Sequence, residues 1–179
     1  MLADQWEELA NKLAGVLDML HNAGADFGLI SANTPHAVFD QVVAKCPIPL
    51  VSIVEETCEE VVRRGLSRVG LLGTAMTMQM DFYQKVFRRH GIQIVVPNEG
   101  EQAYIQDRIM AELARGLLLD ETRQEFLRIG QRMVDELSIQ GLVLGCTEIP
   151  LLLTRDELGI PFLDTGKIHV QSALNRALS

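Results

Sequence analysis

Cys146 is the residue of this sequence whose position best suits catalysis. It follows a short apolar run, Gly141 to Gly145, and precedes Thr147-Glu148-Ile149-Pro150, where the proline suits the first turn of a helix. A cysteine between a strand tip and a helix start lies beside unpaired backbone N–H groups and the positive end of a helix dipole. Such surroundings lower a thiol pKa and favour the thiolate, and the same N–H groups can hold a carboxylate. The spacing alone is equally compatible with a small buried residue that merely fits the turn.

The other cysteines are interpreted as packing residues: Cys46 precedes Pro47, and Cys58 falls in a helical pattern. Three cysteines are an odd number, and their spacing is not that of metal ligands, so no metal is expected. The N-terminus goes straight into a helical pattern with no visible signal peptide. We therefore expect a cytoplasmic protein with reduced thiols.

The composition excludes several classes of partner. Of the 179 residues, 47% are hydrophobic and 22% are charged, which is typical of a globular protein. The formal net charge of −8 argues against binding to nucleic acid or to an anionic membrane. No apolar run approaches the roughly 20 residues of a membrane-spanning helix. A small-molecule substrate is the expected partner.

Short apolar strands alternate with helical patterns along the chain. Strands are expected over 27–31, 49–53, 68–72, 92–96, 141–145 and 161–163. Helices are expected over 4–23, 35–44, 54–64, 75–90, 102–115, 121–138 and 166–178. Strands that are apolar on both faces and separated by helices form parallel sheets covered on both sides. The predicted class is α/β.

Two passages resemble each other and suggest an internal duplication. Phe27-Gly-Leu-Ile-Ser-Ala-Asn-Thr-Pro35 and Gly141-Leu-Val-Leu-Gly-Cys-Thr-Glu-Ile-Pro150 both pair a buried strand with a helix start that carries proline. We predict two similar lobes, residues 1–65 with 164–179 and residues 66–163. Ligands of α/β sheets bind at the carboxyl ends of the strands, so the active site is expected between the lobes.

Four segments, in order along the chain, resemble signatures of the cofactor-independent aspartate/glutamate racemase superfamily. They are Asn33-Thr34-Pro35-His36, Gly70-Leu-Leu-Gly-Thr74-Ala-Met-Thr77-Met, Gly145-Cys-Thr-Glu-Ile-Pro-Leu-Leu152, and Asp164-Thr165 with Ile168-His169.

This resemblance implies proton transfer at the α-carbon of an amino acid by two cysteines on opposite faces, without pyridoxal phosphate or metal. Cys146 matches the cysteine of the second lobe. The residues that match substrate-binding positions are Asn33, Thr34, Thr74, Thr77 and Thr147. Glu148 and His169 are further candidates for substrate binding. Glu148 is otherwise expected to tune the thiol or to cap the following helix and contact solvent, with capping and solvent contact favoured. His169 is expected to contact Glu148, the substrate or a helix end. The resemblance also implies a homodimer.

Two departures from the family pattern stand out. Ala32 precedes Asn33, where a racemase carries its first cysteine, so Ala32 marks the place of a missing base. Aligning the two similar passages on their prolines would instead place Ser31 opposite Cys146, but the Asn-Thr anchor compares like motifs. The strand and glycine-rich loop that open the family's first lobe also have no counterpart, so one N-terminal βα unit of about 30 residues is expected to be missing.

Three functions remain open from the sequence. The leading one is an aspartate/glutamate-type racemase, impaired by Ala32. The second is a single-cysteine decarboxylase or isomerase of the same superfamily, and the third is a protein that binds a small dicarboxylate without turning it over.

Overall fold

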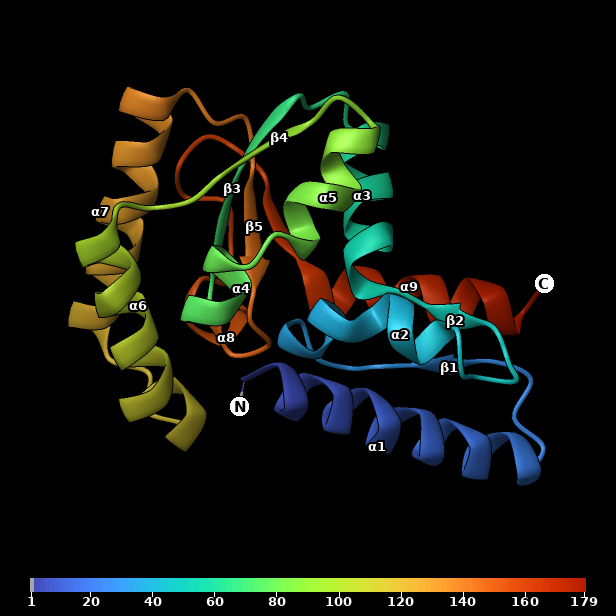
Figure 1. Cartoon of the computed structure of the whole chain (residues 1–179). Helices are drawn as coiled ribbons and strands as arrows, with labels where there is room; N and C mark the ends of the chain where they lie inside the picture. Colours follow the sequence, from blue (N-terminus) through green and yellow to red (C-terminus); the bar gives the residue numbers. More distant parts are fainter. Residues whose placement is uncertain (1) are drawn as a thin grey trace.

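The described chain is an α/β protein with two parallel sheets, which confirms the predicted class (Figure 1). A computed structural model describes residues 2–179, with side chains from Gln5 onward. The strands are β1 Gly28–Leu29, β2 Leu50–Val51, β3 Arg68–Gly73, β4 Gln93–Val95, β5 Leu142–Gly145 and β6 Phe162–Asp164. The longer helices are α1 Leu2–Asn22, α3 Ile53–Arg63, α5 Phe82–Arg89, α6 Glu99–Ala111, α7 Asp120–Leu137 and α9 Thr165–Ala177. The short ones are α2 Phe39–Val43, α4 Ala75–Gln79 and α8 Ile149–Leu152, with 3-10 turns η1 Thr34–Val38 and η2 Leu113–Arg115.

The larger sheet, in the order β4-β3-β5-β6, is covered by helices on both faces. Successive residues of a strand point to opposite faces, so Leu71 of β3 packs with α3 and α5 while Leu72 packs with α6 and α7. β5 alternates in the same way: Val143 packs with α3 and α5, whereas Leu142 and Leu144 pack with α6 and α7. Burial on both faces explains why these strands read as continuous apolar runs.

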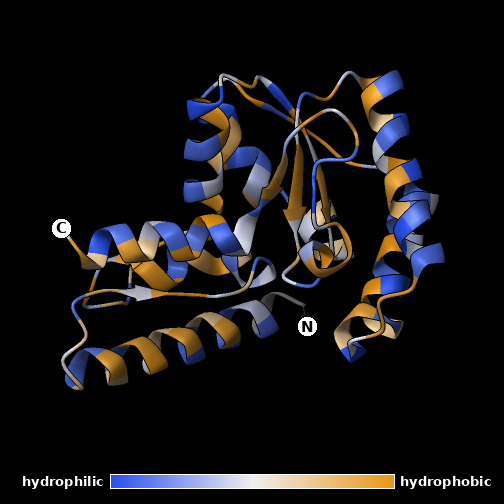
Figure 2. Cartoon of the chain, turned by 180° about the vertical axis from the view of Figure 1, so that it is seen from behind, coloured by the Kyte–Doolittle hydropathy of each residue, from blue (hydrophilic) through white to orange (hydrophobic). Residues whose placement is uncertain are grey.

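The smaller sheet pairs β1 with β2 in parallel, with Gly28 opposite Leu50. α1 packs against it through one apolar stripe, which includes Ala10 and Leu17; Figure 2 shows apolar and polar residues alternating along this helix. A side chain at Gly28 would lie 2.6 Å from Leu17 Cδ2, so glycine lets α1 approach the strand. α9 packs against β2 and α3. We call this sheet with α1, α2 and α9 the first lobe, and the larger sheet with its helices the second lobe.

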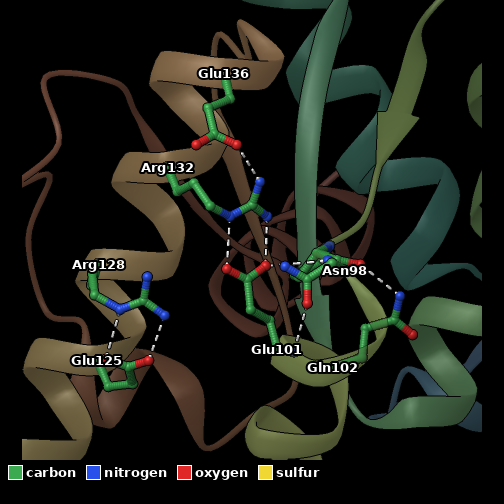
Figure 3. Close-up of polar contacts among 8 residues, drawn as sticks. Asn98, Glu101, Gln102, Glu125, Arg128, Arg132 and Glu136 are labelled. Carbon is green, nitrogen blue, oxygen red and sulfur yellow. Dashed lines mark hydrogen bonds and ion pairs between the residues drawn. The ribbon is translucent and has the colours of Figure 1, made fainter.

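An ion pair between Glu101 and Arg132 joins α6 to α7 (Figure 3). Asn98 and Glu101 form a capping box at the start of α6. The buried Glu101 carboxylate also accepts hydrogen bonds from Arg132 of α7, at 2.7 Å from Nε, and Arg132 reaches Glu136 at 3.0 Å. Next to Glu101, Gln102 donates to the carbonyl oxygen of Pro97 at 2.7 Å. This ion pair holds α6 against α7, and α6 in turn contacts the candidate site.

Several predicted elements differ in length from the observed ones. The predicted helix 75–90 is two helices, because Met80 is extended and ends α4 before α5 begins. The break lets α4 contact α6 while α5 contacts α3. The predicted helix 35–44 begins as a 3-10 turn, and the predicted strands 27–31 and 49–53 each shorten to two paired residues.

The boundary between the lobes at residue 65 stays a prediction. α3 falls within the predicted first lobe but shares a core with the larger sheet through Val54, Cys58 and Val61. Within the described residues β1 pairs only with β2. Among these residues we find no helix with the length and apolar character needed to cross a bilayer.

Candidate active site

Glycines bring the ends of β3 and β5 together. Gly73 and Gly145 end these neighbouring strands and are paired in register. A Cβ atom at Gly73 would lie 2.8 Å from the carbonyl oxygen of Gly145, and one at Gly145 would lie 3.2 Å from Thr77 Cγ2. The loops that follow, with Thr74 and Cys146, therefore start side by side.

Three threonine hydroxyls meet at this edge of the sheet, and we call them the threonine cluster. Thr34 Oγ1 lies 3.1 Å from both Thr74 Oγ1 and Thr77 Oγ1, which are 3.0 Å from each other. Thr34 comes from the first lobe and the other two from the second, so the cluster bridges the lobes. On α6, Gln106 accepts a hydrogen bond from the Ala75 N–H at 2.7 Å and so holds the turn that carries Thr74.

Cys146 is buried, and its thiol donates to Glu148 Oε2 at 2.9 Å. Burial, together with the Glu148 side chain, raises the pKa of Cys146 to about 12. The predicted lowering of the thiol pKa is therefore wrong, because α8 is only one turn long and a carboxylate faces the sulfur. At neutral pH the thiol is protonated, and it donates its hydrogen bond to the Glu148 carboxylate.

Glu148 accepts a second hydrogen bond, from the Thr147 hydroxyl at 2.8 Å. Partial burial raises the pKa of the Glu148 carboxyl, but the hydrogen bonds from Cys146 and Thr147 outweigh burial and leave the pKa below its usual value. The predicted helix-capping role of Glu148 is wrong, since its side chain makes no cap hydrogen bond to α8. Glu148 instead accepts hydrogen bonds from the cysteine and its neighbour.

Two buried histidines support the first-lobe loop. His36 Nδ1 lies 2.9 Å from the carbonyl oxygen of Ala32, and its Nε2 accepts the Ile53 N–H at 3.2 Å. Because Nε2 accepts, Nδ1 carries the proton and donates to Ala32. His169 Nε2 bonds to the carbonyl oxygen of Val51 at 2.9 Å. Among the described residues His169 makes no hydrogen bond to Glu148, so that alternative is wrong, while its contact with substrate stays a prediction.

Asn33 lies in the interior rather than at an open surface. Its side chain accepts from the Tyr83 hydroxyl at 2.5 Å and donates to Thr165 Oγ1 at 3.1 Å. Neither partner is among the residues singled out for substrate from the sequence. The Asp-Thr motif did mark Thr165, whereas Tyr83 carries no local signal because only the fold brings α5 to Asn33.

A hollow of about 960 Å³ lies between α3, α9 and the segment after α8; its lining includes Leu144 and Pro150 but not Cys146. Acidic and basic side chains mix in its lining, including Glu59, Arg63, Arg155 and Lys167. Nothing in this lining matches the chemistry expected of the site. Among the described residues no group of three or more His, Cys, Asp or Glu side chains could hold a metal ion.

Comparison with known proteins decides the family. The family model described as Asp/Glu/Hydantoin racemase matches residues 2–173. The chain belongs to this racemase family. The resemblance seen in the sequence is thereby confirmed.

Individual members of the racemase family extend the comparison. The chain is 25% identical over 162 residues to the broad specificity amino-acid racemase RacX of Bacillus subtilis, covering 89% of this chain and 68% of RacX. The solved structure of PH1733, an aspartate racemase homologue from Pyrococcus horikoshii OT3, superposes with a TM-score of 0.89 at 35% identity, covering 98% of this chain and 77% of PH1733. The Picrophilus torridus aspartate racemase shares the fold, with a TM-score of 0.78 at 21% identity, covering 94% of this chain and 69% of that one.

Proposed function

We propose that this protein is an amino-acid racemase of the aspartate/glutamate type, in which Cys146 transfers the α-proton without a bound cofactor. The observation that carries the proposal is the Cys146 thiol hydrogen-bonded to Glu148 beside a cluster of threonine hydroxyls. The family match supports the reaction class. The cysteine chemistry and the substrate are our inference.

The threonine cluster is proposed to bind the substrate carboxylate. Its hydroxyls now bond to one another, and each can turn to donate to an incoming anion. Hydrogen bonds to a charged group contribute roughly 1.5–3 kcal/mol each, so a few such donors suffice to orient a small substrate. Asn33 precedes Thr34 and Thr147 follows Cys146 in the sequence, and His169 bonds to the carbonyl oxygen of Val51 in β2.

The proton transfer needs Cys146 as a base and as an acid. Glu148 takes the thiol proton, and the resulting thiolate removes the α-proton of the substrate, which leaves a thiol and a carbanion. The thiol then returns a proton to the same face of the carbanion, and Glu148 gives its proton back to the thiolate. Cys146 by itself therefore exchanges the α-proton, and inversion needs a proton donor on the opposite face. A thiolate of raised pKa is a stronger base, which suits the very weakly acidic α-proton.

Ala32 favours the second candidate, a reaction that uses one face only, as in a single-cysteine decarboxylase or isomerase. An alanine side chain moves no proton, so the face opposite Cys146 lacks the cysteine that a racemase would place there. We expect the natural chain to exchange the α-proton with solvent faster than it inverts the α-carbon.

The experiment compares the natural chain with Ala32→Cys in deuterated buffer, on L- and D-aspartate, L- and D-glutamate and arylmalonate. Exchange is read by proton NMR and inversion by circular dichroism. Cys58→Ala is the control for a change in the number of cysteines outside the site, because Cys58 is fully buried on α3. We expect Ala32→Cys to raise inversion without raising exchange to the same degree. Loss of carbon dioxide from arylmalonate would establish the decarboxylase instead. Binding without exchange or product in either protein would reject catalysis.

A further inference from the structure

A buried chain of hydrogen bonds runs from Tyr83 to β5, the strand that ends directly before Cys146. The Tyr83 hydroxyl lies 2.5 Å from Asn33 Oδ1, Asn33 Nδ2 lies 3.1 Å from Thr165 Oγ1, and Thr165 Oγ1 lies 3.0 Å from the carbonyl oxygen of Leu144. Tyr83 and Thr165 are fully buried, and Asn33 is 4% exposed.

The last acceptor fixes the direction of every bond in this chain. A carbonyl oxygen only accepts, so the Thr165 hydroxyl must donate to Leu144 and accept from the Asn33 amide nitrogen. The amide oxygen of Asn33 then faces Tyr83, whose hydroxyl must donate. Burial raises the pKa of Tyr83, so its phenol keeps the proton that it donates. Loss of any one group leaves a buried polar partner unpaired, which is costly.

The chain ties together the elements that hold the proposed reacting groups. Asn33 precedes Thr34 of the threonine cluster, and Leu144 lies two residues before Cys146. Tyr83 belongs to α5 and Thr165 begins α9, so both anchors sit on helices rather than on the loops. The chain therefore spans the gap between the lobes through the protein interior, behind the site.

We propose that Tyr83 is a positioning residue, which acts through Asn33 and Thr165 to hold Thr34 and Cys146 at the separation that proton transfer needs. This inference rests on the proposed function. Tyr83 bonds to Asn33 and is not itself a proposed substrate donor, so its removal deletes no donor and changes only the alignment of Thr34 with Cys146. A misplacement of about 1 Å can cost about 100-fold in rate. The turnover number should therefore suffer while the KM does not.

The first test measures α-proton exchange by Tyr83→Phe, Thr165→Val and Thr165→Ser. We expect kcat to fall about 10- to 100-fold in Tyr83→Phe and Thr165→Val, with KM within about twofold. Thr165→Ser keeps the hydroxyl and should restore kcat. Tyr104→Phe is the matched control, because Tyr104 is a partly buried tyrosine of α6 that packs on Phe126 and takes no part in the hydrogen-bond chain from Tyr83 to Leu144. Wild-type kcat in Tyr83→Phe, or no rescue by Thr165→Ser, would overturn the inference.

A second measurement does not depend on activity. Alkylation of Cys146 by iodoacetamide, followed by peptide mass spectrometry, should be faster in Tyr83→Phe than in the natural chain, while buried Cys58 stays at its original rate. Faster alkylation in a chain without exchange activity would reject the proposed reaction yet keep the positioning role. An unchanged Cys146 rate would reject the positioning role even if exchange is observed.

Discussion

At the scale of single residues, the Cys146 thiol keeps its proton and donates it in a hydrogen bond to Glu148. Burial and the Glu148 side chain raise the thiol pKa to about 12 from an ordinary 9.0. Glu148→Gln removes the carboxylate but leaves the burial, so we expect the pKa to fall while staying above 9.0. The pH profile of Cys146 alkylation measures this, with Cys58, whose pKa burial also raises to about 12, as the internal reference. An identical Cys146 profile in the variant would show that the carboxylate does not act on the thiol.

His36 gives a second residue-scale prediction, on stability. Burial lowers its pKa from 6.5 to about 4. As pH falls from 6.5, the unfolded chain takes up this proton first, so stability is full above 6.5 and is lost as pH falls toward 4. The loss from this group is about 3 kcal/mol. Urea unfolding of the natural chain should therefore show a steeper pH dependence in this window than His36→Gln, and parallel curves would contradict the assignment.

At the scale of elements, the contact between β3 and β5 limits which residues their ends tolerate. A Cβ at Gly145 would lie 2.8 Å from Leu71 Cδ1 and 3.0 Å from the carbonyl oxygen of Leu72. We expect Gly145→Ala to destabilise the fold by about 1–3 kcal/mol and to displace the Cys146 loop. Gly15→Ala is the matched control, because its Cβ would have no neighbour within 4 Å and alanine favours the α1 helix. Equal melting temperatures for the two variants would contradict the close approach.

The sequence predicts the elements best where a strand is buried on both faces. The starts of β3 and β5 fall within one residue of prediction, because their apolar runs are unbroken. The break at Met80 could not be predicted, since the apolar spacing from Met78 through Phe82 continues across it. The raised thiol pKa and the position of Tyr83 could not be predicted from the sequence either, because burial and facing charges are properties of the folded chain.

At the scale of the whole molecule, the first lobe leaves apolar surface uncovered. Leu29 of β1 is 37% exposed, and on α9 Val170 is 68% and Leu174 49% exposed. Such surface favours association, as does the free edge that β1 leaves within the described residues, where it pairs only with β2. We therefore predict a homodimer or larger assembly, to be measured by light scattering coupled to gel filtration. A monomer at high micromolar concentration would contradict this prediction.

The most direct test of the account concerns Cys146 alone. The natural chain and Cys146→Ala are incubated with the same amino-acid substrate in deuterated buffer, and the α-proton signal is followed by NMR. We expect Cys146→Ala to exchange at least about 100-fold more slowly, as loss of an acid/base group requires, while its melting temperature stays close to that of the natural chain. Equal exchange by the two proteins would contradict the assignment of Cys146 as the group that moves the proton.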